Sequence, residues 1–83
     1  MDMNNAKSLA EAFISKNIDP PIDDCYQIID SAIREDTEGW YFPFQSKRFI
    51  ETRDMKFSVV GNWPVFVSKD GITVEQRRAM PNR

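Results

Sequence analysis

The fold is decided at residues 5–17, whose sequence is NAKSLAEAFISKN. Apolar side chains recur in this segment at helical spacing, at Ala6, Leu9, Ala10, Phe13 and Ile14. This stripe predicts an amphipathic helix with one face turned toward the core. Asn4 or Asn5 offers a side-chain oxygen for the N-cap, and Pro20 and Pro21 end the helix soon after the segment, because proline disfavours helical backbone in the residue before it.

Two segments after this helix predict a β-hairpin. Residues 26–34 are rich in β-branched side chains, and residues 40–45 follow them after the polar turn 35–39. In the second segment, the aromatic side chains that alternate onto one face are Trp40, Phe42 and Phe44. Because Pro43 lacks an N–H, we expect this strand to lie at an edge there, to carry a bulge, or to turn that position away from the ladder.

The rest of the chain predicts a second hairpin. Residues 65–68 and 72–74 are short strand candidates joined through Lys69-Asp70-Gly71. Residues 47–60 match neither the helical nor the strand period, so their structure stays open, and residues 75–83 are expected to form a short helical turn and a frayed tail. We therefore expect one α+β domain over residues 1–83, with an N-terminal helix packed on an antiparallel sheet of about four strands.

Composition agrees with a single small domain that has a thin core. The chain has 83 residues, of which 20 are Leu, Ile, Val or Phe. With one leucine against six Phe, two Trp and two Tyr, aromatic side chains must supply most of the buried area.

Several functional classes are excluded by what the sequence lacks. The absence of histidine removes imidazole bases and imidazole metal ligands. Cys25, the one cysteine, cannot form an internal disulfide or a thiolate zinc cluster, and we expect it to be a small buried or half-buried side chain. Gly39, Gly61 and Gly71 are isolated and form no phosphate-binding loop. We therefore expect no enzymatic activity, no cofactor and no metal.

Location and nucleic-acid binding follow from the same composition. The start of the chain shows no apolar leader behind a basic segment, and no apolar run reaches membrane-spanning length, so we expect a cytoplasmic protein without membrane contact. Four basic residues lie near aromatic ones, at Lys47, Arg48, Arg53 and Lys56. The acidic pI of about 5.0 argues against a nucleic-acid partner all the same.

Charge is unevenly distributed along the chain. Residues 1–46 carry nine acids and three bases, for a net charge of −6, and residues 47–83 carry eight bases and four acids, for +4. Such asymmetry is typical either of a surface for a basic partner or of a solvated face. The acids at 35, 36 and 38 do not have calcium-loop spacing, and adjacent Asp23 and Asp24 point to opposite faces of an extended chain.

Four short motifs follow one another between residues 39 and 71. They are Gly-Trp-Tyr at 39–41, Phe-Ile-Glu-Thr-Arg-Asp at 49–54, Gly-Asn-Trp-Pro at 61–64, and a short strand followed by Lys-Asp-Gly at 69–71. In this order the chain resembles the immunity protein 35 family, also called YrhB-like. The matching residues are Gly39, Trp40, Phe49, Glu51, Thr52, Asp54, Gly61, Asn62 and Pro64. The chain departs from the family pattern at Arg53, where the family's turn has glycine, and at Trp63, where the family has a small residue.

The resemblance implies a small cytoplasmic protein that neutralises a cognate bacterial toxin by stoichiometric protein–protein blocking. Acids would then face basic toxin residues, and aromatic side chains would be desolvated anchors. The residues that we expect to bind the partner are Asp23, Asp24, Glu35, Asp36, Glu38, Trp40, Tyr41 and Trp63. Trp63 has an open alternative, in which it folds back to cap the core. The competing functional class is a chaperone-like or stress-related protein that binds apolar segments of several clients.

Overall fold

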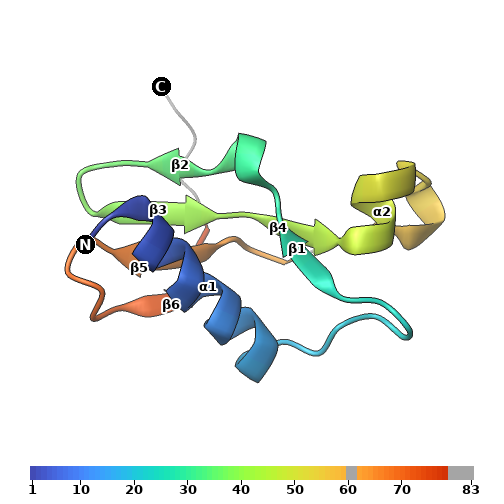
Figure 1. The fold of residues 1–83 in the computed structure, drawn as a ribbon, viewed down its shortest axis with the longest axis horizontal. Helices are drawn as coiled ribbons and strands as arrows, with labels where there is room; N and C mark the ends of the chain where they lie inside the picture. Colours follow the sequence, from blue (N-terminus) through green and yellow to red (C-terminus); the bar gives the residue numbers. More distant parts are fainter. Residues whose placement is uncertain (60–61, 79–83) are drawn as a thin grey trace.

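The structure, a computed structural model, describes residues 1–59 and 62–78 of the chain. One long helix precedes a set of short antiparallel strands (Figure 1), which confirms the expected α+β class. In chain order the elements are α1 (Met3–Asn17), β1 (Tyr26–Ile28), β2 (Arg34–Glu35), β3 (Gly39–Phe42), β4 (Phe44–Ser46), α2 (Lys47–Thr52), β5 (Val65–Ser68) and β6 (Val74–Gln76). Single turns of 3-10 helix lie at Asp30–Ala32 and Met55–Phe57.

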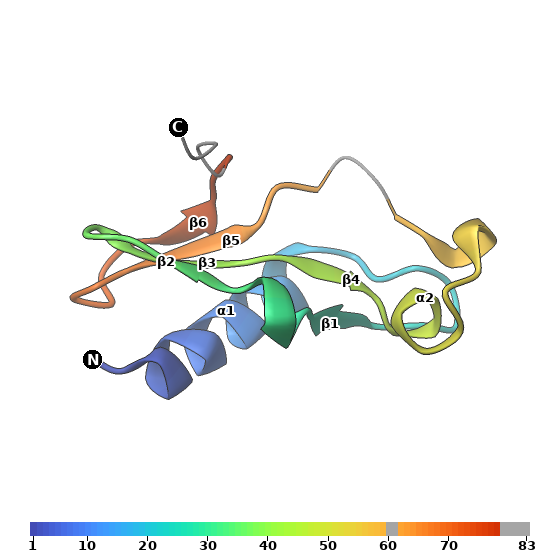
Figure 2. The same ribbon diagram turned by 90° about the horizontal axis from the view of Figure 1, so that it is seen from above.

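Helix α1 begins two residues before the predicted segment and ends where predicted. Its N-cap is Asp2 rather than Asn4 or Asn5, because the Asp2 carboxylate accepts a hydrogen bond from the Asn5 N–H at 2.9 Å. Three buried residues at helical spacing form its inner face: Ala6, Ala10 and Ile14. This face packs on β3, β5 and β6, so α1 covers one face of the larger sheet (Figure 2).

The strands form two antiparallel sheets. The larger has the order β2-β3-β5-β6, and the smaller pairs β1 with β4. Both predicted hairpins are present, since β2 pairs with β3 and β5 with β6. β3 and β5 approach closely at Gly39, where a Cβ would collide with the main-chain carbonyl oxygen of Val67.

Each strand predicted for the first hairpin is divided between the two sheets. The first is broken between β1 and β2 by the 3-10 turn Asp30–Ala32, and the second is broken between β3 and β4 at Pro43. Pro43 has no N–H to give to a ladder, but its carbonyl accepts a hydrogen bond from the Ile29 N–H at 2.9 Å. Both predicted strands therefore leave the larger sheet at the same level and continue into the smaller one.

Aromatic side chains fill much of the core, as predicted. Trp40, Phe42 and Phe44 lie on the helix side of the sheets, in one cluster with Val65 and Val67. The alternation predicted for the three aromatics is therefore confirmed. It continues across the break at Pro43, because Phe44 in β4 points to the same side as Trp40 and Phe42 in β3.

The segment left open by the sequence contains a short helix, α2. Ser46 caps it, because the Ser46 hydroxyl oxygen accepts a hydrogen bond from the Phe49 N–H at 3.2 Å. It ends at Arg53, whose φ of 59° and ψ of 20° lie in the left-handed region and whose N–H bonds to the Phe49 carbonyl at 2.7 Å. A six-residue helix followed by a turn is too short to show a period in the sequence.

The second hairpin has a longer loop than predicted. β6 begins at Val74 rather than at Ile72, and Gly71 takes a φ of 76° in the loop. Residues 75 and 76, predicted to begin the C-terminal tail, continue β6 instead, because Glu75 pairs with Phe66 and Gln76 with Val65. Of residues 75–83, for which the sequence predicts a helical turn and a tail, residues 79–83 lie outside the described residues.

Candidate partner-binding surface

The five predicted acids lie at opposite ends of the molecule. Glu35 ends β2, and Asp36 and Glu38 lie in the turn that follows it, whereas Asp23 and Asp24 belong to the segment that joins α1 to β1 (Figure 1). These two segments are at the two ends of the long axis, along which the protein extends over 36 Å. The acids therefore do not form one continuous surface.

Asp24 is engaged in holding its own end of the fold together. One carboxylate oxygen accepts a hydrogen bond from the Cys25 N–H at 2.7 Å, and the other accepts one from the Ser46 hydroxyl. The hydrogen bond from Ser46 is the main cause that holds the pKa of Asp24 below its ordinary value. Because Ser46 also caps α2, Asp24 fastens the start of β1 to the start of that helix.

Asp23, by contrast, is exposed and has strained backbone. Its φ is 57°, in the left-handed region, and the turn is closed by a hydrogen bond from the Asp24 N–H to the Pro21 carbonyl at 3.2 Å. Ile22, inside the same turn, is 92% exposed. The loop thus presents one apolar and one acidic side chain to solvent.

The acids of the β2–β3 turn also have intramolecular partners. The Asp36 carboxylate accepts hydrogen bonds from the Glu38 and Gly39 N–H groups, at 2.8 and 3.0 Å, which fixes the turn. Glu35 forms an ion pair with Lys69. These contacts leave all three acids exposed.

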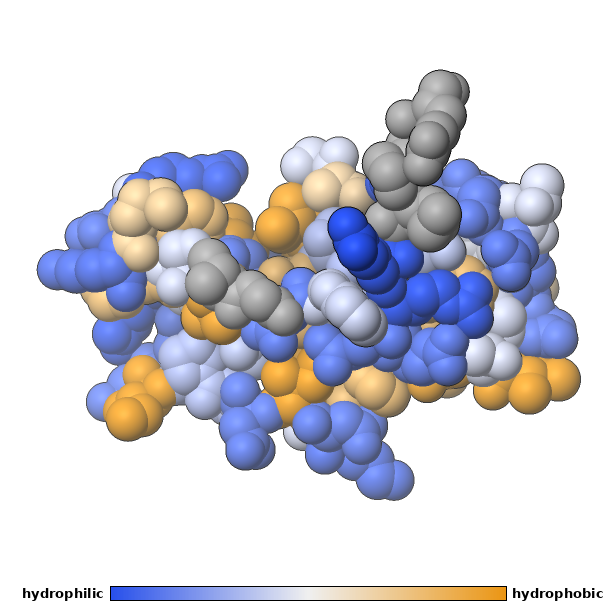
Figure 3. Space-filling view, turned by 180° about the vertical axis from the view of Figure 1, so that it is seen from behind, coloured by the Kyte–Doolittle hydropathy of each residue, from blue (hydrophilic) through white to orange (hydrophobic). Residues whose placement is uncertain are grey.

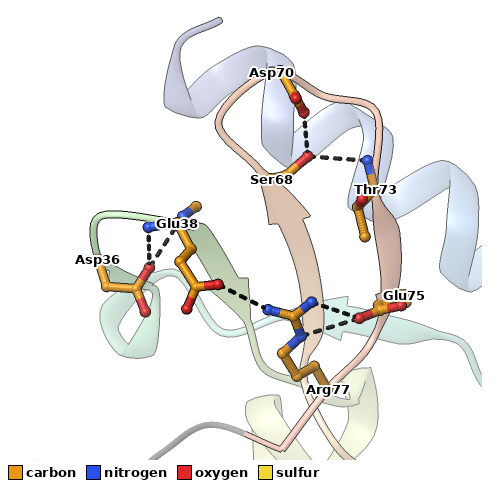
Figure 4. Close-up of polar contacts among 8 residues, drawn as sticks. Asp36, Glu38, Ser68, Asp70, Thr73, Glu75 and Arg77 are labelled. Atoms are coloured by element: carbon orange, nitrogen blue, oxygen red, sulfur yellow. Dashed lines mark hydrogen bonds and ion pairs between the residues drawn. The ribbon is translucent and has the colours of Figure 1, made fainter.

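Arg77 links this turn to β6 on the face of the sheet opposite α1. Its guanidinium lies 2.8 Å from the Glu75 carboxylate and 3.7 Å from that of Glu38 (Figure 4). The hydrogen bond to Glu75 is the main cause that raises the pKa of Arg77. The guanidinium also lies 3.9 Å from the centre of the Phe66 ring, and Phe66 packs against Tyr41 at 5.0 Å between ring centres. Charged side chains therefore cover the outer aromatic pair.

The three aromatic residues predicted to bind a partner have different surroundings. Trp40 is 4% exposed and lies in the core under the Lys69 ammonium, 4.5 Å from its ring centre. Tyr41 is 6% exposed, on the outer face. Trp63 is 55% exposed, so it does not close over the core as its alternative required. Trp63 thus has the largest exposed fraction of the three.

Two exposed apolar residues that were not predicted as site residues lie at the same end of the molecule as the β2–β3 turn. Ile72 is 82% exposed in the β5–β6 loop, and the side chain of Met1 contacts Gly71 in the same loop. Figures 1 and 2 show the N-terminus next to this loop and near the β2–β3 turn. We name this surface the turn end and define it by Met1, Glu35, Asp36, Glu38, Asp70 and Ile72. The sequence predicts a loop at residues 69–71 and so places Ile72 in a strand. A loop that runs two residues further, to Thr73, would have placed Ile72 in the exposed loop.

Viewed from the side opposite α1, the surface is mostly hydrophilic with separate small apolar patches, one of them at the end that carries the two turns (Figure 3). Cys25 is exposed, which corrects the expectation that it is buried or half-buried. It lies before β1 begins, next to the turn that Asp24 closes, and lines a pocket of about 250 Å³.

Within residues 1–59 and 62–78, no group of three or more Cys, Asp or Glu side chains could hold a metal ion. No helix in this part of the chain has the length and apolar character needed to cross a bilayer.

Comparisons with known proteins give one family. The sequence profile of the immunity protein 35 family matches residues 4–82. The uncharacterized protein YrhB of Escherichia coli (strain K12) is 41% identical over 34 residues, which cover 41% of this chain and 36% of YrhB. The matched segment thus spans about a third of the length of that relative. No solved structure matches. The match over residues 4–82 shows that this chain belongs to the immunity protein 35 family.

Proposed function

We propose that the protein binds a cognate bacterial toxin in a stoichiometric complex and blocks it. The observation that carries this proposal is the family match over residues 4–82, since the family is one of immunity proteins. A toxin that acts inside the cell must be met there, so the proposal places the protein in the cytoplasm.

The turn end is the surface that best supports this function. Ile72 offers exposed apolar area in the β5–β6 loop, where Asp70 also lies. Glu35, Asp36 and Glu38 are exposed at the β2–β3 turn at the same end of the molecule, with Glu35 paired to Lys69. Protein interfaces combine apolar anchors with a polar rim, and an acidic rim speeds the encounter with a basic partner. The turn end therefore fits a toxin surface that is basic around an apolar depression.

The function is tested by a purification of the tagged protein from its native cells, followed by mass spectrometry and a toxicity assay. We expect one partner at near-equal amount that stops growth when expressed alone and is harmless when this protein is co-expressed. Several partners at low amounts, none of them toxic, would instead indicate the chaperone-like class. Ionic strength separates the two classes again, because salt slows a charge-steered association, whereas apolar capture is unchanged or strengthened.

The location of the surface is tested by a matched pair of substitutions. Ile72 and Ile22 are both strongly exposed isoleucines, but they lie at opposite ends of the molecule. We expect Ile72→Ser to weaken the toxin complex and Ile22→Ser to leave it unchanged, with both variants folded. The reverse pattern would move the interface to the loop that carries Asp23.

A further inference from the structure

Strand β6 forms an edge of the larger sheet, and in the described part of the chain β5 is the one strand that pairs with it. Backbone groups of an antiparallel strand point alternately to its two sides. The Arg77 N–H donates to the Pro64 carbonyl at 3.0 Å, so Arg77 and, two residues earlier, Glu75 direct their backbone groups toward β5. The N–H and C=O groups of Val74 and Gln76 therefore point outward, where a further strand can pair with them.

The side chains along this edge carry both signs of charge. Glu75 and Arg77 lie on the sheet face opposite α1, with side chains that are 49% and 34% exposed (Figure 4). Two hydrogen bonds join the Arg77 guanidinium to Glu75, and both use the carboxylate oxygen Oε2. The Oε1 atom can therefore accept a hydrogen bond from another cation. Because the guanidinium also lies over the Phe66 ring, the two charges have fixed places along the strand.

This order of charges is complementary to itself when two β6 strands run antiparallel. If Gln76 lies opposite Gln76 of a second copy, Glu75 of each copy lies opposite Arg77 of the other. The Gln76 pair is then hydrogen-bonded, because both residues direct their backbone groups outward. The Glu75–Arg77 pairs fall at the positions without hydrogen bonds, where opposite Cα atoms are about 4.5 Å apart and side chains are closest.

Other registers of the same two strands are unfavourable. A shift of one strand by two residues places either two Glu75 or two Arg77 side chains opposite each other, and like charges at such positions are destabilising. A shift by one residue places backbone groups that point outward opposite groups that point toward β5, so the ladder cannot form. The charges and the backbone therefore select the same register.

We infer that β6 pairs with β6 of a second copy in a two-fold symmetric dimer, with the two Gln76 residues at the axis. Each copy uses the same surface, so the contact closes on itself and adds no third copy. The four strands of each larger sheet then form one sheet of eight strands, with both α1 helices on the same face. The dimer goes beyond the proposed function, because the β2–β3 turn lies at the opposite edge of each sheet and remains accessible to a toxin.

The first experiment measures the mass of the full chain by sedimentation equilibrium over a series of concentrations. We expect the mass to rise from 9.7 kDa toward twice that value. Gln76→Pro removes the outward N–H at the centre of the contact and leaves the bonds to β5, because an edge strand tolerates proline where the N–H faces solvent. Gln76→Ala is the matched control, since it also loses the side-chain hydrogen bond to the Trp63 carbonyl but keeps the N–H. We expect the alanine variant to dimerise and the proline variant to stay monomeric. A monomeric unmodified protein, or a dimer that survives Gln76→Pro, would overturn the inference.

Charge variants test the register separately. Glu75→Arg and Arg77→Glu each place like charges opposite one another in the β6 pair, so each should raise the dissociation constant of its own dimer by about tenfold. An equimolar mixture of the two variants should dimerise again, because each then faces the opposite charge. The double variant Glu75→Arg/Arg77→Glu should dimerise by itself, and it keeps the charge pair within each copy. Urea unfolding of each variant is the control for folding. Single variants that dimerise as well as the unmodified protein, or a mixture and a double variant that both stay monomeric, would overturn the inference.

Discussion

Replacement of Arg53 by glycine tests how α2 ends. Arg53 has a φ of 59° in the left-handed region, and the resemblance described above places the family's turn glycine at this position. Left-handed backbone costs an L-residue about 1–2 kcal/mol. Glycine avoids this cost, but its greater conformational freedom in the unfolded chain lowers the stability by about 0.4–1 kcal/mol relative to alanine. We therefore expect the free energy of unfolding of Arg53→Gly to be about 0.5–1 kcal/mol larger than that of Arg53→Ala.

The comparison with alanine isolates the backbone effect. The Arg53 guanidinium lies 5.9 Å from the centre of the Phe49 ring, and both Arg53→Gly and Arg53→Ala remove this contact. The two variants then differ only in the Cβ. In the interior of a helix alanine is the more stable of the two by about 1 kcal/mol, so the expected order is the opposite of the helical one.

The assay is urea denaturation followed by tryptophan fluorescence, with thermal unfolding as a second measurement. The glycine variant should melt about 2–8 °C above the alanine variant, as expected for this free-energy difference in a domain of this size. Equal m-values are the control, because they show that both variants unfold from the same native state. An alanine variant at least as stable as the glycine variant would refute the left-handed end of α2.

Three other predictions concern the fold and the surface. Gly39→Ala should destabilise the protein by about 1–3 kcal/mol in urea denaturation, because its Cβ meets the Val67 carbonyl; an unchanged midpoint would contradict the close approach of β3 and β5. Because the folded-state pKa of Asp24 is lowered, its contribution to stability is present above its ordinary pKa of about 3.9 and is lost as pH falls through the folded value. The urea midpoint of Asp24→Asn should thus fall less steeply below about pH 4 than that of the unmodified protein; parallel curves would argue against the Ser46 hydrogen bond. Trp63→Ala should leave both cooperative unfolding and the toxin complex intact, because Trp63 is 55% exposed and precedes β5 at the end of that strand away from the turn end; a weakened complex would move the interface toward Trp63.

Local patterns in the sequence predicted the elements better than their partners. Helix α1 and the two hairpins follow from periodicity and turn residues, which act over a few neighbouring positions. Pro43 marked a break in its strand, but the continuation of both predicted strands into a second sheet involves the hydrogen bond from Ile29, which is fourteen residues away in the sequence. The N-cap at Asp2 was missed because Asn4 and Asn5 are equally good capping residues. Such choices depend on packing elsewhere in the chain.

The candidate site was harder to predict, because charge along the sequence is not charge in space. The acidic first half and basic second half meet where β3 lies beside β5. There Lys69 pairs with Glu35, and Arg77 approaches Glu38. These two contacts bring bases of the second half against acids of the first, so the difference between the halves does not by itself create an acidic face.

What distinguishes the turn end is the combination of its remaining acids with exposed apolar area. Asp36 and Asp70 each direct a carboxylate oxygen to backbone N–H groups of their own turns, which holds the two loops in fixed conformations. Ile72 is displayed on one of these loops at 82% exposure. A rigid loop loses little conformational entropy when a partner binds, so an exposed isoleucine there contributes more to affinity than one on a mobile segment. The hydrogen bonds that the Asp36 and Asp70 carboxylates accept from their own turns therefore also hold in place the surface to which we propose that the toxin binds.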